Sequence, residues 1–159
     1  MIRQIPYSYK SIVKNALIAA AAVGPLGIFG ALDTVGVGAV WTTMFLAIRD
    51  KSNTKLGVNP KRICAGVASG IAGYYIGCKA ATYAMFLIPG LGPVVAIIAA
   101  MGVSAACNIY FTYRFAVTTI DLFNKANYSD DDIIAFFINH LKKIPNVDEI
   151  KEIAEIYQS

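Results

Sequence analysis

Two long apolar stretches constrain this chain more than any other feature of its sequence. Residues 15–48 contain a single charged side chain, that of Asp33, and residues 80–113 contain none. Each stretch is 34 residues long, whereas one helical crossing of a bilayer takes about 20 apolar residues. We therefore predict an all-α fold in which each stretch forms a hairpin of two membrane helices.

Glycine and proline interrupt both stretches near their middle, where they favour turns or hinges over one straight helix. These residues are Gly24, Pro25, Gly27 and Gly30 in the first stretch and Pro89, Gly90, Gly92 and Pro93 in the second. The predicted arms are 12–30, 34–48, 63–87 and 94–113. Because the second arm has only about 15 residues, or roughly 22 Å of helix, a re-entrant hairpin stays open beside two full spans.

Composition and charge divide the chain into two parts. The whole sequence is 57% hydrophobic and 15% charged, with a mean hydropathy of +0.56, whereas a soluble domain is about 25% charged. Residues 1–120 carry ten basic and two acidic residues, and 121–159 carry four basic and eight acidic ones. We predict a membrane-embedded helical hairpin domain over 1–120 and an acidic amphipathic helical tail over 121–159.

The basic residues cluster at three places along the chain. One cluster precedes the first stretch, one lies at 49–62 between the stretches, and Arg114 follows the second stretch. The positive-inside rule assigns such clusters to the cytoplasmic side. We therefore predict a membrane protein with both termini in the cytoplasm.

Small residues recur every four positions on the predicted third helix. They are Ala65, Gly66, Ser69, Gly70, Gly73 and Gly77. Such a face lets another helix backbone approach closely and is typical of helix association in lipid. The face could pack within the chain or against a second copy in a homo-oligomer.

Three polar residues lie within or beside the apolar stretches. Asp33 and Lys79 each need a partner, water or an interface position, because a charge near the bilayer centre costs at least about 2.5 to 3.5 kcal/mol. Asp33 could cap a helix that starts at Thr34, or pair with Lys79. Asn108, with Thr112 on the same face, could bond across helices or line a polar path.

The tail shows two amphipathic patterns. Ser129 is the expected N-cap of a helix whose apolar stripe comprises Ile133, Ile134, Phe137, Ile138, Leu141 and Ile144. A shorter second helix is predicted to use Val147, Ile150, Ile153 and Tyr157. These stripes need something to cover them, either the chain's own helices, the membrane surface or a partner protein.

Catalytic and metal-binding patterns are absent from the sequence. The chain has one histidine, His140, and three cysteines without a CxxC spacing, and it lacks a P-loop. We therefore predict no catalytic residues, no cofactor and no metal site. We also predict no nucleic-acid binding, because the positions of the basic residues are already explained by the membrane topology.

Short motifs at four places carry a family resemblance. They are Ala31-Leu32-Asp33 after the first turn, Ile88-Pro89-Gly90-Leu91-Gly92, Thr112-Tyr113-Arg114, and a helix end near Phe123-Asn124. Over roughly residues 12–140 the chain resembles a bacterial membrane-associated domain family of unknown function that accompanies small GTPases. The resemblance implies a helical domain of the inner membrane without catalytic residues. Because this sequence has no GTPase domain, any nucleotide-linked role would need a separate partner.

Three functions fit these patterns. The first is a non-enzymatic, self-associating module in the lipid bilayer that presents residues 126–159 to a cytoplasmic protein partner, a GTPase if the resemblance holds. Deleting this tail should then abolish partner capture and leave the body in the membrane. The second is an oligomeric pore or transporter whose broken helices line a path containing Asp33, Lys79 or Asn108. The third is a soluble oligomeric or lipid-binding helical bundle that inserts on a trigger.

Overall fold

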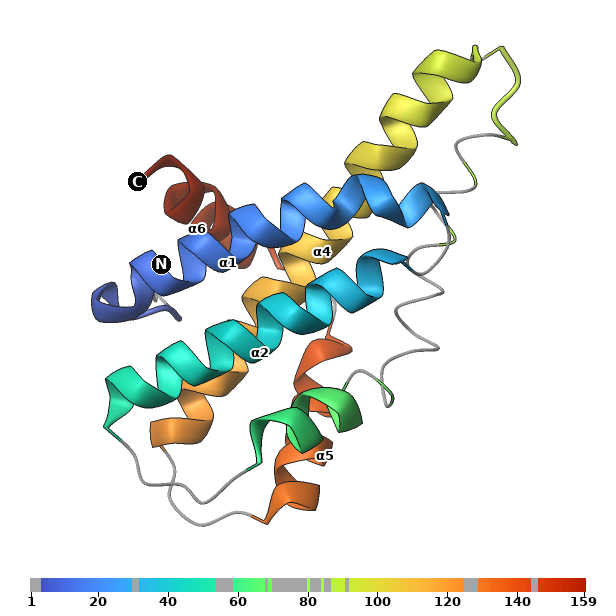
Figure 1. The fold of residues 1–159 in the computed structure, drawn as a ribbon. Coiled ribbons are helices and arrows are strands. Elements are labelled where there is room, and N and C mark those ends of the chain that lie inside the picture. Colours follow the sequence, from blue (N-terminus) through green and yellow to red (C-terminus); the bar gives the residue numbers. More distant parts are fainter. Residues whose placement is uncertain are drawn as a thin grey trace.

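The computed structural model of this chain is helical, as Figure 1 shows. It describes residues 4–29, 32–53, 59–67, 69, 80, 84, 87–90, 92–124, 129–143 and 146–159, and these contain helices and turns but no strand. The predicted all-α class is therefore confirmed for this part of the chain.

The first apolar stretch folds back on itself. After a 3₁₀ turn at Tyr7–Tyr9, helix α1 spans Lys10–Val23, the 3₁₀ segment η2 spans Gly24–Phe29, and α2 runs back over Leu32–Ser52 (Figure 1). The predicted arms 12–30 and 34–48 correspond to α1 with η2 and to α2, and Gly24, Pro25 and Gly27 lie in the 3₁₀ segment. Gly30 lies outside the described residues.

Gly24 lets α1 approach α4 closely. A Cβ atom at this glycine would lie 2.6 Å from Cα of Ala105 on α4, closer than real Cβ contacts allow. Gly36 plays the same part inside the hairpin, because its Cβ would lie 2.9 Å from Cγ1 of Val23. Both glycines therefore set the distance between packed helices.

The proline and glycine residues of the second apolar stretch form a turn and then the start of a helix. Pro89 and Gly90 form a turn in which Gly90 has a φ of +83°, a conformation that glycine adopts without a steric penalty. Pro93 then occupies the first position of α4, which spans Pro93–Asn124. Of the preceding arm, predicted at 63–87, the structure describes a helix over 60–67 and a few isolated positions.

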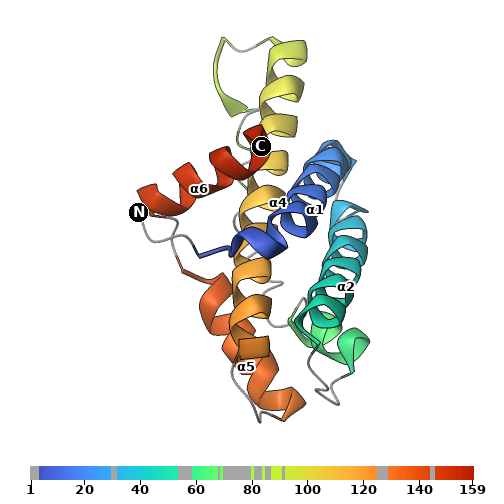
Figure 2. The same cartoon turned by 90° about the vertical axis from the view of Figure 1, so that its left-hand side faces the viewer.

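Helix α4 is longer than the predicted arm 94–113. It continues without a break through Arg114 and across the predicted boundary at 120/121. Figure 2 shows α1 and α2 on one side of α4 and α6 on the other, while the first turns of α4 extend beyond the other labelled helices.

The tail forms two capped helices. Helix α5 spans Asp130–Leu141 and α6 spans Val147–Gln158, and each begins with a capping box, Ser129 with Asp132 and Asn146 with Glu149. Reciprocal bonds of this kind satisfy amide groups that the first turn of a helix leaves unpaired.

The core lies where α1, α2 and α5 surround the second half of α4. Trp41 of α2 stacks on Phe115 of α4 with 4.7 Å between ring centroids, and Phe137 of α5 contacts the same ring at 4.7 Å. Ile133 and Leu141 of α5 are also buried in this core. The first tail stripe is therefore covered by the chain's own helices.

Candidate functional site

Helix α4 changes environment half-way along its length. Val94, Val95 and Ile98 are 69%, 56% and 63% exposed near its start, whereas every residue from 111 to 120 is buried. In the described part of the chain, one helix is long and apolar enough to cross a membrane, Pro93–Phe123, and 28% of its most apolar window is buried.

Other exposed aliphatic side chains lie toward the same end of the molecule. Leu87 is 82% exposed, Leu26 of η2 is 43% exposed, and Val35 near the start of α2 is 77% exposed. We call η2, the first turns of α2 and residues 87–98 the apolar end. Asp33, in the first turn of α2, is the one charged residue of these segments, and its side chain lies outside the described structure.

A buried ion pair marks the other half of α4. Nη2 of Arg114 lies 2.9 Å from each carboxylate oxygen of Glu149 on α6, and it donates a hydrogen bond to Oε2. Nε of Arg114 donates to the hydroxyl of Tyr110 at 2.9 Å. Both charged side chains are at least nine-tenths buried, so each depends on the other for compensation.

Glu152 forms a second buried polar junction one turn along α6. Its Oε2 accepts hydrogen bonds from the hydroxyl of Tyr113 at 2.7 Å and from the amide of Gln4 at 3.0 Å. Its Oε1 accepts from the amide of Ile5 at 2.9 Å. This one carboxylate therefore joins the N-terminal segment, α4 and α6.

Tyr157 joins α6 to α1. Burial raises the pKa of its phenol. It donates to the carbonyl oxygen of Leu17 over 3.4 Å, a long bond that adds little to the packing around it.

The inward face of α6 differs from the predicted stripe. Glu149, Glu152 and Ile156 are buried, whereas Val147 and Ile150 are 66% and 56% exposed. Of the predicted stripe, Ile153 and Tyr157 do pack against the core. The prediction was wrong for Val147 and Ile150, because it counted apolar residues alone, while the partners on α4 and at the N-terminus are donors that require carboxylates. An arginine in apolar surroundings was the sequence signal for such a partner.

Asn108 and Thr112 connect α4 to the hairpin. Nδ2 of Asn108 donates to the carbonyl oxygen of Ala20 on α1 at 3.2 Å. Nε1 of Trp41 on α2 donates to Oγ1 of Thr112 at 3.0 Å. Both α4 side chains are fully buried, so they lie at helix crossings in this structure.

The remaining predicted residues are described in part. Helix α2 begins at Leu32, so Asp33 lies within its first turn, and the Asp33 side chain lies outside the described structure. A Cβ on Gly66 would lie 2.5 Å from Cδ1 of Ile134, so this glycine packs against α5 of the same chain. Ala65 and Ser69 are exposed. The others are not described: Gly70, Gly73, Gly77 and Lys79.

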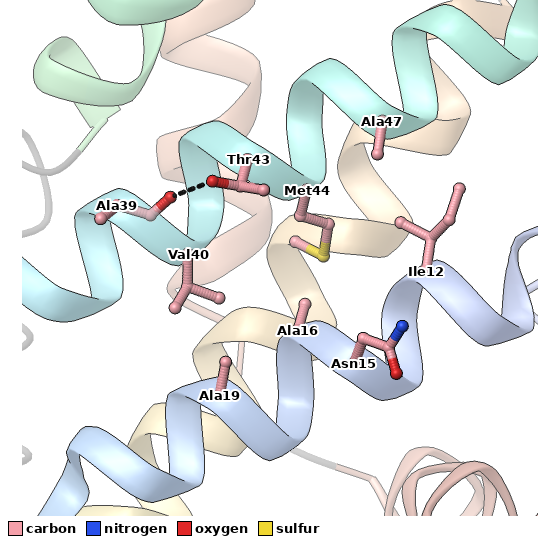
Figure 3. Close-up of a pocket in the computed structure, with 9 residues that line it drawn as sticks. All are labelled: Ile12, Asn15, Ala16, Ala19, Ala39, Val40, Thr43, Met44 and Ala47. Carbon is pink, nitrogen blue, oxygen red and sulfur yellow. Dashed lines mark hydrogen bonds between the residues drawn. The ribbon is translucent and has the colours of Figure 1, made fainter.

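An apolar groove of about 420 Å³ lies between α1 and α2 (Figure 3). Its lining residues are Ile12, Asn15, Ala16, Ala19, Ala39, Val40, Thr43, Met44 and Ala47. Oγ1 of Thr43 donates to the carbonyl oxygen of Ala39 at 3.0 Å, so the helix itself satisfies this hydroxyl. Four alanines leave the space between the helices unfilled.

The described residues contain no group of three or more His, Cys, Asp or Glu side chains that could hold a metal ion. Comparisons with protein families, with curated proteins and with solved structures gave no match for this chain. In its described residues the fold is that of a helical protein with one helix of membrane length and an apolar end.

Proposed function

We propose that the protein is a non-enzymatic membrane module. Its apolar end enters the bilayer, and its charged end, including α5 and α6, stays in water and faces a cytoplasmic partner. A small GTPase is the partner that the family resemblance favours. The observation that carries this proposal is the change of environment along α4, from exposed and uncharged to buried and ion-paired.

The dimensions of α4 support this arrangement. Its first half, residues 93–110, in which exposed residues alternate with the buried Ala96, Ala100, Ser104 and Asn108, is about 27 Å long at 1.5 Å per residue, close to the roughly 30 Å of a bilayer's hydrocarbon core. Moving one exposed Val or Ile from water into an apolar phase contributes about 1.5–3 kcal/mol. Several such side chains together supply a strong driving force for insertion.

The charged side chains on the tail limit how far the protein can enter the membrane. Lys142, Lys143, Asp148 and Lys151 are exposed on or beside α5 and α6, and a charge in hydrocarbon costs several kcal/mol. These helices cover the second half of α4. The membrane boundary therefore falls near the middle of α4, and Arg114 lies on the aqueous side with its charge balanced by Glu149.

The surface available to a partner differs from the surface of an amphipathic tail that is not packed against the body. The apolar stripe of α5 is in the core, and the outward face of α6 combines exposed Val147 and Ile150 with charged neighbours. Deleting 126–159 would remove Phe137 and Glu149 from the core, so it would unfold the body. Substitutions on the outward face of α6 test partner capture without this effect.

Depth-dependent quenching tests the arrangement. Trp41 is the single tryptophan, so in a Trp41→Phe background one new tryptophan reports one position. We compare Ile98→Trp at the apolar end with Ile150→Trp on α6, because these isoleucines have similar exposure, 63% and 56%. Both full-length variants are reconstituted into vesicles whose phospholipids are brominated in the middle of their acyl chains.

The two positions should respond differently. We expect strong quenching by bromine at position 98, and at position 150 quenching by aqueous iodide alone. Equal responses at both positions, or iodide access at position 98, would contradict the proposed orientation. Helicity and membrane retention after alkaline extraction verify that each variant is folded and reconstituted.

A further inference from the structure

A basic pocket adjoins the apolar groove at Asn15, which lines both. The pocket measures about 570 Å³, and its lining residues are Tyr7, Ser8, Lys10, Ser11, Lys14, Asn15, Lys51 and Ser159. Lys10 and Lys14 are one turn apart on α1, and the hairpin brings Lys51, near the end of α2, beside them. No Asp or Glu side chain is among the described residues that line it.

We infer that the groove and the pocket together bind one anionic glycerophospholipid. The lysines and the serine hydroxyls receive the phosphate, and the groove receives an acyl chain. Lysine ammonium groups bind phosphate as compact charges. The groove is mainly apolar: Asn15 lies at its junction with the pocket, and the hydroxyl of Thr43 is already bonded within α2. A ligand that satisfies both parts must be anionic at one end and aliphatic at the other.

The direction of the site matches that of a lipid in a bilayer. The pocket lies at the end of the hairpin opposite its reversal, so it is remote from η2. From Ala47 to Ala39 the groove follows α2 for about 12 Å toward the apolar end. In the proposed membrane orientation, on which this inference rests, the headgroup would lie on the aqueous side, and the chain would point toward the membrane boundary near Thr112 of α4, which Trp41 contacts beside the groove.

Charge favours a lipid over a second copy of the chain as occupant. A helix packed in the groove would leave the lysines of the pocket without anionic partners, whereas a phospholipid supplies the phosphate together with the chain. Lys10 also lines a neighbouring cavity that contains Glu155. Lys14 and Lys51 are therefore the lysines to replace in a test of this pocket.

Native mass spectrometry of the full-length protein in detergent tests the site. The spectra count bound lipids and subunits at once while dioleoyl phosphatidylglycerol or dioleoyl phosphatidylcholine is titrated. The variants are the double change Lys14→Gln/Lys51→Gln and the groove-filling change Ala39→Leu. The matched control is Lys142→Gln/Lys143→Gln, which removes two exposed charges elsewhere.

We expect one phosphatidylglycerol to bind in preference to phosphatidylcholine. Each pocket lysine should contribute about fivefold in affinity, so the double variant should lose roughly 25-fold and the control should lose little. Ala39→Leu should weaken both lipids, because it occupies the space of the chain. Glycerol phosphate, which lacks a chain, should not compete.

Four results would overturn the inference. Equal binding of the two lipids would exclude a headgroup site, and equal loss in the control would indicate non-specific attraction. A change of subunit number in Ala39→Leu would identify the groove as a contact between copies. If the lysine variants lose no affinity but the protein still resists alkaline extraction, the lipid site fails and membrane association stands.

Discussion

Replacing Glu149 by Gln should destabilise the protein strongly, because it leaves a buried arginine without its counter-charge. Glutamine has nearly the same shape as glutamate, and its side-chain oxygen can still accept the hydrogen bond from the amide of Asn146, which is 3.1 Å long in this structure. The change therefore removes the charge and leaves the capping box and the packing in place.

The magnitude follows from the burial of the pair. The side chains of Arg114 and Glu149 are 9% and 1% exposed. Breaking such a buried pair by removing one partner typically costs about 3–5 kcal/mol. For a chain of this length that corresponds to a melting temperature lower by roughly 6–20 °C.

The matched control is Glu155→Gln, the same change on the same helix at an exposed position, where about 0–1 kcal/mol is expected. Trp41, buried against Phe115 next to Arg114, reports unfolding by its fluorescence during thermal or urea denaturation. The double variant Arg114→Gln/Glu149→Gln should recover part of the loss, since it leaves no uncompensated charge. Equal stabilities of Glu149→Gln and Glu155→Gln would refute the reasoning.

Two further predictions concern the junctions between helices. Gly24→Ala should lower the free energy of unfolding by about 1–3 kcal/mol, because the new Cβ would force α1 away from Ala105. Gly102→Ala has open space around it and should instead stabilise α4 by about 0.5–1 kcal/mol. Thermal melts of the two variants measure both effects, and the opposite order would show that α1 and α4 do not pack at Gly24. Glu152→Gln should loosen the N-terminal segment, because the amide keeps only one oxygen and its NH₂ group would face the backbone N–H of either Gln4 or Ile5, which bond to different oxygens of the carboxylate. Hydrogen exchange at these two backbone amides should accelerate while exchange within α2 stays unchanged. Unaltered protection would show that the carboxylate does not hold the segment.

Local patterns predicted much of the secondary structure. Gly90 adopts a positive φ and Pro93 begins a helix, because these outcomes depend on one residue's own backbone. Ser129 was expected to cap α5, and the structure shows this cap, since a capping bond spans only three residues. These features need no knowledge of what packs around them.

The candidate site was predicted less well. The sequence predicts Arg114 as a flank of the membrane but does not identify its partner, Glu149, 35 residues away. The apolar pattern of α6 predicts the inward positions of Ile153 and Tyr157 but misses Glu149 and Glu152, because hydrophobicity alone defines the stripe. A carboxylate can be buried on such a face when the neighbouring segments supply hydrogen-bond donors to it.

The sequence by itself determined that the chain is helical, where it turns and which stretches are apolar, because apolar length, proline and glycine act within a few residues. The tertiary structure alone decided where α4 passes from an exposed to a buried environment and which charges face one another. Both depend on how helices distant in the sequence pack, since burial and ion pairing are properties of neighbours in space.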